Sequence, residues 1–365
     1  MTRRAFVHRL PMCSPDDVGA LEAAIRSGVV DAGSVVAVFG KTEGNGCVND
    51  WTRALATRAV RDLLGRHIGR AADDVLLVMS GGTEGALAPH LTLFEVRTTS
   101  ERPDTAALAV GRARTGALAP EHLGRLDQVR DVAEAVGVAL ADAGIEDPAD
   151  VHFVQVKCPL ATPERIADAE ARGAVCVTRD TLKSMGLSRA AASLGIALAL
   201  GEVTADSVEE AAIGTDWRLF SSRASASAGV ECLGHEIVVL GAGRDWSGPL
   251  RVDHAMMADA LDIEPVRSAF ARLGLPTTGQ LSTDQRGRLV ALMAKTEASS
   301  TGLLRGCRHT MLVDSDIAPT RQARGFTAGV LAGLVGHAEL YVSGGAEHQG
   351  PDGGGPVAII VAAAA

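Results

Sequence analysis

One short pattern occurs three times in this chain of 365 residues, and it constrains the fold more than any other feature. Each copy consists of a serine, a small residue, a glycine, a variable residue and a glutamate. The copies are SGGTEG at Ser80, SAGVEC at Ser227 and SGGAEH at Ser343. A glycine after a small residue permits a positive φ or a close approach of the backbone to another group. Three such turns, about a third of the chain apart, indicate an internal repeat.

The segments around the serines recur as well. An apolar run that ends in lysine lies earlier in each third: VVAVFGK at Lys41, VHFVQVK at Lys157 and RLVALMAK at Lys295. Apolar segments lead to the serines (DDVLLVMS, DWRLFSSRASAS and AELYVS), and further apolar segments follow the turns (HLTLFEVR, HEIVVLGAG and PVAIIVAAA). We expect all of these segments to be strands.

Between the lysine and the serine, each third has an alanine-rich helical pattern that begins with an arginine. These arginines are Arg53, Arg189 and Arg324, with Arg321 as a nearby competitor in the third copy. The expected order in each copy is therefore a strand ending in lysine, a helix entered by arginine, a strand ending in serine, and a strand. The middle copy has the longest loop, at TADSVEEAAIGTDW.

Shifts in composition place linkers at RTTSERPDTA and GAGRDWSGPLRVD. The expected units are residues 1–104, 112–249 and 255–365. Each is an α/β layer too small to bury both faces of its sheet alone. We therefore predict an α/β fold in which three similar units pack around a pseudo-threefold axis, with a central barrel-like core of sheets.

The composition agrees with this fold class and excludes several functions. The chain is 47% hydrophobic and 22% charged, with 41 glycines, which is typical of α/β proteins. A net charge of −9 without a basic run argues against a nucleic-acid partner. No secretory signal or membrane span is expected, and six scattered cysteines indicate reduced thiols and a cytoplasmic protein. The histidines show no HxH or HExxH spacing, so the sequence does not support a catalytic zinc site.

A lone lysine, serine or arginine at such places is most often a solvated charge or a turn residue. The recurrence of all three points instead to one shared cavity. A lysine can act as a base for a serine when its amine is neutral, and both burial and neighbouring cations favour the neutral form. Glycine-rich turns add backbone N–H donors that stabilise an oxyanion. This chemistry is Ser–Lys acyl transfer on a small ligand with carbonyl groups, best one with threefold character.

These segments resemble the ring-opening amidohydrolases, the family of cyanuric acid hydrolase and barbiturase. The likeness covers the whole chain and rests on GKTEGNG, SGGTEG, SSRASASAGVE, AKTEASS and SGGAEHQGPDGGGP. The resemblance implies three repeat units around a pseudo-threefold axis. It also implies hydrolysis of cyanuric acid to carboxybiuret, which loses CO₂ to give biuret. A homotetramer is expected on the same basis.

The resemblance assigns roles to the repeated residues. Ser227 would be the nucleophile and Lys157 its base, because the family uses the middle unit for catalysis. The remaining substrate contacts would come from Arg53, Arg189, Arg324, Ser80, Gly81, Ala228, Ser343 and Gly344, with Lys41 and Lys295 as auxiliary cations.

The C-terminal loop AEHQGPDGGG suggests a hard-cation site, because backbone carbonyls and a carboxylate are ligands for such ions. By resemblance, a structural Mg²⁺ or Ca²⁺ would be held by Glu297, Ala346, Gln349, Gly350, Pro351 and Gly354. We expect His348 to be a surface residue of this loop.

Three other functions remain open from the sequence. Barbiturase would use the same groups on a pyrimidine ring. A binding protein on the same scaffold would need no lysine beside a serine. An amidase-signature enzyme is also Ser–Lys, but it would have one long Gly/Ser-rich core rather than three separate copies.

Overall fold

The computed structural model describes residues 2–101 and 105–364. Its strands form three larger sheets, each with the same order of strands. In each sheet, the strand with the repeated lysine lies between the serine strand and the strand that follows the serine turn. The fourth strand comes from earlier in the unit and pairs with the strand that follows the serine turn. Sheet A has the order β3-β2-β4-β1-β9, sheet B the order β7-β6-β8-β5 and sheet C the order β14-β11-β15-β10.

The strand bounds are as follows. Sheet A contains β1 (Thr2–Pro11), β2 (Val35–Thr42), β3 (Leu76–Gly81), β4 (His90–Thr99) and β9 (Trp246–Ser247); sheet B contains β5 (Ala107–Arg114), β6 (Val151–Cys158), β7 (Ala224–Ala228) and β8 (Glu236–Gly243). Sheet C contains β10 (Leu250–Met257), β11 (Leu289–Thr296), β14 (Tyr341–Gly344) and β15 (Gly355–Ala362), and a small hairpin contains β12 (Leu303–Leu304) and β13 (Cys307–Arg308).

The pairing of the lysine and serine strands has the same direction and register in all three sheets. Both strands run parallel, and the lysine lies directly opposite the serine. The pairs are Lys41 with Ser80, Lys157 with Ser227, and Lys295 with Ser343. The repeat seen in the sequence is therefore also a repeat of strand order and register.

Each repeated arginine lies in the first half of a long helix: α2 (Trp51–Ile68), α5 (Thr181–Ala199) and α8 (Pro319–Val335). Two of these helices have a side-chain N-cap. The Asp50 carboxylate accepts a hydrogen bond from the N–H of Thr52, and the Asp180 carboxylate accepts one from the N–H of Lys183. The other helices are α1 (Gly19–Arg26), α3 (Leu126–Ala143), α4 (Pro163–Ala171), α6 (Glu264–Arg272) and α7 (Thr283–Arg288). Short 3₁₀ helices are η1 (Ala32–Ser34), η2 (Gly69–Asp74), η3 (Pro120–His122), η4 (Pro148–Asp150), η5 (Ala205–Ser207) and η6 (Glu210–Ala212).

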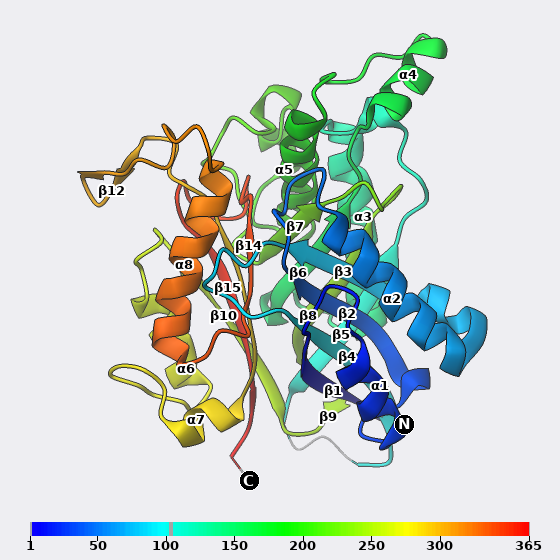
Figure 1. The fold of residues 1–365 in the computed structure, drawn as a ribbon, viewed down its shortest axis with the longest axis vertical. Coiled ribbons are helices and arrows are strands. Elements are labelled where there is room, and N and C mark those ends of the chain that lie inside the picture. The colour runs from blue at the N-terminus through cyan, green and yellow to red at the C-terminus, as the bar shows by residue number, and fades with distance from the viewer. Residues whose placement is uncertain (1, 102–104, 365) are drawn as a thin grey trace.

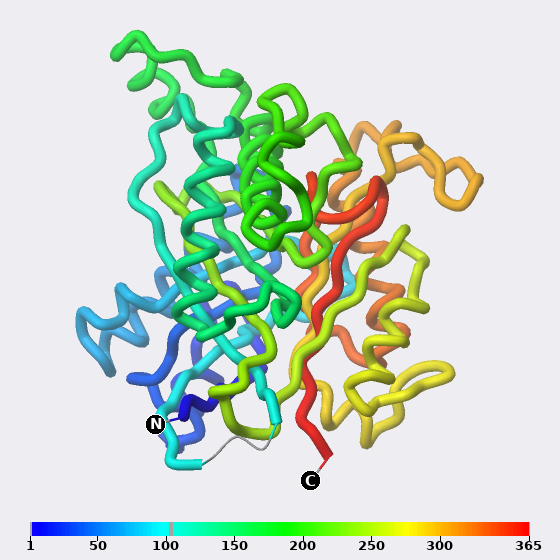
Figure 2. The backbone as a smooth tube through the Cα atoms, turned by 180° about the vertical axis from the view of Figure 1, so that it is seen from behind, coloured from blue at the N-terminus to red at the C-terminus, as the bar shows by residue number. Residues whose placement is uncertain are grey.

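The helices lie on the outside and the sheets meet inside (Figure 1). Buried residues of all three sheets form one large apolar cluster, which includes Phe39, Phe153 and Met293. The ring of Phe39 lies 5.6 Å from that of Tyr341, so this contact joins sheet A to sheet C. Figure 2 shows the C-terminal strand β15 running beside β10, its antiparallel partner. Joint burial of the inner sheet faces is what units of this size were expected to need.

The structure corrects several expectations. The described strands form separate open sheets, not a closed barrel. The first strand of each sheet, β1, β5 or β10, was not recognised as part of the repeat. The expected serine strand from residue 216 begins only at Ala224, and the supposed linker at residues 241–253 contains the end of β8, all of β9 and the start of β10. Within the described residues, no helix is long and apolar enough to cross a membrane.

Candidate active site

The three repeated lysines link the units in a closed ring. Each amine donates a hydrogen bond to the carbonyl oxygen of the residue just before a serine of another unit. The three bonds are Lys41 Nζ to Val342 (2.6 Å), Lys157 Nζ to Met79 (2.9 Å) and Lys295 Nζ to Ala226 (2.8 Å). All three lysine side chains are fully buried or nearly so. The strand register thus brings the three lysines and the three serine turns together.

The three serines differ from one another. The hydroxyls of Ser80 and Ser343 lie 2.6 Å apart, and Lys41 Nζ lies 3.3 Å from Ser80 Oγ. Ser227 is half-buried, whereas Ser80 and Ser343 are buried. The Ser227 hydroxyl accepts a long hydrogen bond of 3.4 Å from Gln155 Nε2. Ser227 is therefore not tied to either of the other two serines.

The lysines differ too. Lys157 Nζ lies 2.9 Å from Oε1 of Glu231, the glutamate of the middle serine turn. Lys41 and Lys295 instead each donate a second bond to a carbonyl oxygen, that of Gly81 (3.3 Å) and that of Gly344 (3.0 Å). The middle copy alone thus has a lysine–carboxylate pair among these three described lysines.

Burial sets the charges of these groups. Burial, aided by Arg324, lowers the pKa of Lys41 well below its usual value. Burial, aided by Arg189, lowers the pKa of Lys295 to about 7. Burial raises the pKa of Glu231, but the neighbouring Lys157 and Arg53 together outweigh it, and the pKa falls to about 2. Lys41 and Lys295 are therefore both weaker cations than the sequence led us to expect.

The repeated arginines contact serine turns of other units. Arg189 binds Glu347 through Nε (2.8 Å) and Nη2 (2.6 Å), and Arg324 binds Glu84 in the same way at 2.6 and 2.5 Å. Arg53 Nη1 donates to the carbonyl of Ala228 at 3.0 Å. These bidentate contacts fix the planes of two guanidinium groups.

Two glycines of the repeated pattern make room for these arginines. Gly82 has a φ of +92°, and a Cβ there would lie 1.9 Å from Nη2 of Arg324. Gly345 has a φ of +79°, and a Cβ there would lie 2.5 Å from Nε of Arg189. The expected need for positive φ and close approach is thus met at both turns.

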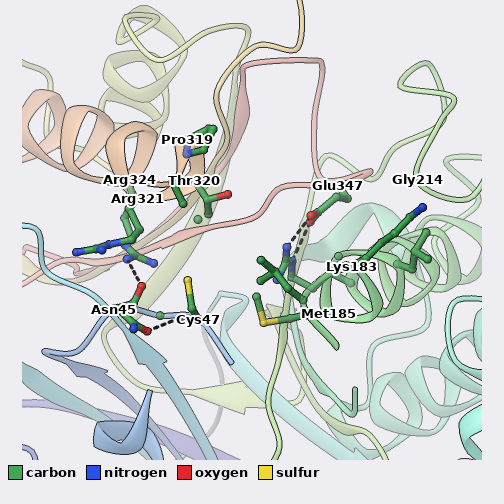
Figure 3. Close-up of a pocket in the computed structure, with 17 residues that line it drawn as sticks. Asn45, Cys47, Lys183, Met185, Gly214, Pro319, Thr320, Arg321, Arg324 and Glu347 are labelled. Carbon is green, nitrogen blue, oxygen red and sulfur yellow. Dashed lines mark hydrogen bonds and ion pairs between the residues drawn. The ribbon is translucent and has the colours of Figure 1, made fainter. Parts of the chain in front are cut away.

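A cavity of about 430 Å³ opens where the three units meet. Its wall combines the loop after β2 (Asn45 to Cys47), the first part of α5 and the first part of α8. Figure 3 shows Arg324 and Asn45 on one side of it, and Glu347, Lys183 and Met185 on the other. Arg189, Arg324 and Gly344 border this cavity, while Arg321 also reaches it and lies 3.5 Å from Glu84.

The residues predicted to hold a structural cation are compatible with one. Burial and the nearby Glu347 raise the pKa of Glu297, so a cation beside this carboxylate would relieve an unfavourable charge. The carbonyls of Ala346 and Pro351 each accept one backbone hydrogen bond, which leaves a lone pair free. The side-chain oxygen of Gln349 accepts a hydrogen bond from the backbone N–H of Ala226. The backbone carbonyl of Gln349 is therefore the oxygen that it can offer to a cation.

The expectation for His348 was wrong. Its side chain is buried at 1% exposure, its Nε2 accepts from the N–H of Gly214, and its ring stacks on Trp217. His348 thus fixes the C-terminal loop to the long loop of the middle unit.

No role was predicted from the sequence for the glutamates of the repeated pattern. Glu84 and Glu347 orient arginines of other units, and Glu231 pairs with Lys157. The signal was present, because the glutamate follows every one of the three serines at the same spacing.

Comparisons with known proteins identify the family of this chain. The family described as amidohydrolase ring-opening protein matches residues 6–362. A curated relative named cyanuric acid amidohydrolase, from Bradyrhizobium sp. (strain ORS 375), is 60% identical over 98% of both chains, and one of the same name from Azorhizobium caulinodans is 58% identical over 98% of both. The crystal structure of a cyanuric acid hydrolase from A. caulinodans superposes with a TM-score of 0.93 at 56% identity, covering 100% of both chains. A second cyanuric acid hydrolase structure, described as an evolutionary innovation by structural concatenation, has a TM-score of 0.95 at 47% identity over 100% of both chains. The chain therefore belongs to the ring-opening amidohydrolase family.

Proposed function

We propose that this protein hydrolyses cyanuric acid and opens its ring. The observation that carries the proposal is the closed ring of lysines and serine turns beside a cavity to which all three units contribute. A ligand with three equivalent carbonyl groups would present the same group to each of the three units. The names of relatives that are about 60% identical support the same substrate.

We also infer that the three units are related by a pseudo-threefold axis through this ring. Support comes from the equal strand orders and from the cyclic direction of the lysine bonds, which run from sheet A to C, from C to B and from B to A. Arg53, Arg189 and Arg324 would then bind the carbonyl oxygens of the substrate. Ser80 with Gly81, Ser227 with Ala228, and Ser343 with Gly344 would complete the contacts.

In the proposed reaction, Oγ of Ser227 attacks a ring carbonyl carbon and its proton passes to the amine of Lys157. The C–N bond then breaks, and Lys157 returns the proton to the departing ring nitrogen. Water hydrolyses the resulting acyl-enzyme, which releases carboxybiuret and restores the serine. Carboxybiuret loses CO₂ to give biuret.

Lys157 must be neutral to begin this sequence, yet it rests beside a carboxylate. The carboxylate of Glu231 favours the charged form of this amine, so the amine must lose its proton before Ser227 attacks. The choice of Ser227 is supported by its greater exposure and by its separation from the other two serines.

The pair formed by Lys41 and Ser80 is a second candidate for catalysis. Its atoms lie 3.3 Å apart, and burial lowers the pKa of Lys41, as a lysine base requires. In our proposal, the bond between Ser80 and Ser343 reserves these residues for binding.

Several finer statements remain proposals. Glu297 and the carbonyls of the C-terminal loop would hold Mg²⁺ or Ca²⁺ as a structural ion, with no part in the chemical step. The homotetramer and the cytoplasmic location stay predictions, as do the residue boundaries of the three units.

A side-by-side assay of cyanuric acid and barbituric acid with the purified protein tests the proposed function. We expect a higher kcat/KM for cyanuric acid, with biuret and CO₂ as the final products. A higher value for barbituric acid would instead indicate a barbiturase. Tight binding of cyanuric acid without turnover would indicate a binding protein.

A further inference from the structure

Two histidines and an aspartate meet between sheets B and C, away from the candidate active site. They are His152 of β6 and the neighbours Asp253 and His254 of β10. The Nδ1 atoms of the two histidines lie 2.9 Å apart, and Oδ1 of Asp253 lies 3.5 Å from the first and 4.0 Å from the second. One ligand atom from each residue therefore converges on a common point, within 4.8 Å of the others.

This geometry is compatible with a bound metal ion. Two imidazole nitrogens that bind one ion at about 2.1 Å lie roughly 3.0 to 3.4 Å apart when the angle between them is about 90 to 110°. The observed separation of 2.9 Å is close to this range. Without an ion, the two rings can share one hydrogen bond, because one neutral ring donates and the other accepts.

The surroundings allow an ion to enter. The side chains of His152 and His254 are 18% and 26% exposed, whereas that of Asp253 is 12% exposed. Arg272 Nε donates to Oδ2 of Asp253 at 2.6 Å, while Oδ1 accepts from the backbone N–H of His254 at 2.7 Å and is the oxygen that faces the rings. Such a contact to the far side of a ligand is a common way to orient it.

The ligand set selects the type of ion. Mg²⁺ and Ca²⁺ require several oxygen ligands, and this cluster offers one carboxylate and two imidazoles. Two imidazoles with one carboxylate suit Zn²⁺, Ni²⁺ or Cu²⁺. We propose that His152, Asp253 and His254 form a binding site for one such nitrogen-preferring divalent ion, with Zn²⁺ as the reference case and water completing its coordination.

The site would be structural. His152 lies near the start of β6 and Lys157 near its end, about 17 Å apart at about 3.3 Å per strand residue. An ion held by β6 and β10 would join sheet B to sheet C. Because it would bind the folded protein, it would raise the melting temperature without changing the chemical step.

Isothermal titration of ZnCl₂ into the untagged full-length protein tests the proposal. The protein is first stripped with a chelator and then saturated with Mg²⁺, so that any hard-cation site is filled. We expect one zinc site in the wild type, with at least tenfold weaker binding in His152→Ala and in His254→Gln. The matched control is His67→Ala, which removes an exposed histidine of α2 and should leave binding unchanged.

The melting temperature is a second readout, which separates loss of zinc binding from poor folding of a variant. Zinc should raise the melting temperature of the wild type and of His67→Ala, but not that of either site variant. If the wild type and both site variants bind zinc equally well, the zinc is bound by other groups, such as the exposed thiols of Cys13 and Cys307. That result, or a wild type that binds no zinc, would overturn the proposal.

Discussion

The amine of Lys157 lies 2.9 Å from the carboxylate of Glu231, and this pair distinguishes the middle repeat from the other two. The glutamates at the matching positions, Glu84 and Glu347, bind arginines instead. Among the described residues, no carboxylate forms an ion pair with Lys41 or Lys295. The glutamate of the repeated pattern thus binds an arginine in two repeats and a lysine in the middle repeat.

Glu231→Gln should shift the pH dependence of catalysis. Removal of the carboxylate makes the charged form of the Lys157 amine less favourable, so the neutral amine persists to lower pH. We expect the acidic limb of kcat/KM against pH to move to lower pH. The measurement is the pH profile of kcat/KM with cyanuric acid.

Glu84→Gln is the matched control for that profile, since it changes the same position of the pattern in another repeat. Its partner is Arg324, which we propose to bind substrate. We expect a higher KM with the acidic limb unmoved. An acidic limb that stays in place for Glu231→Gln, or moves to higher pH, would contradict a role for Glu231 in the charge of Lys157.

Lys295→Met should change how stability depends on pH. Burial lowers the pKa of Lys295 to about 7 from 10.5 in an unfolded chain. Between these values the unfolded chain holds a proton that the folded protein lacks, so this residue makes the free energy of unfolding rise with pH. We expect a smaller rise from pH 7 to pH 10 in the variant than in the wild type.

Denaturant unfolding at several pH values measures this rise. Lys183→Met, at an exposed position of α5, should leave it as in the wild type. Equal slopes for wild type and Lys295→Met would show that the Lys295 amine keeps its charge in the folded protein.

Removal of the proposed structural cation should lower stability and spare the chemistry. Chelation, or Glu297→Ala, should lower the melting temperature and loosen the C-terminal loop, because an ion that binds only the folded state stabilises it. Mg²⁺ or Ca²⁺ should restore the melting temperature of the wild type alone. Lost activity at an unchanged melting temperature would point to a catalytic metal instead.

Much of the fold was accessible from the sequence, because the lysine strands and the serine strands β3 and β14 are mostly apolar segments that lead to a polar residue. One of the first strands, β1, was missed for a physical reason. β1 is half-buried along most of its length and includes Arg3, Arg4 and Arg9, so it lacks a clear apolar pattern. β9 has two residues and is a strand only through its pairing with β1.

The members of the candidate site were predictable and their contacts were not. Recurrence identified the lysines, serines and arginines, but the partners of each side chain belong to other units. Arg324, and not Arg321, binds Glu84 bidentately. This choice depends on the orientation of α8 relative to a turn of sheet A. Likewise, His152 and His254 are far apart in the sequence, and only the packing of β6 against β10 brings them together.

The most direct test of the account is kcat/KM for cyanuric acid in three matched variants, Ser80→Ala, Ser227→Ala and Ser343→Ala. Loss of the nucleophile should cost more than loss of a binding hydroxyl, by analogy with other serine hydrolases about 10⁴-fold or more. The account predicts that Ser227→Ala loses the most activity and forms no acyl-enzyme detectable by mass spectrometry. The opposite result, with Ser80→Ala the most impaired and Ser227→Ala still able to form the acyl-enzyme, would assign catalysis to Lys41 and Ser80.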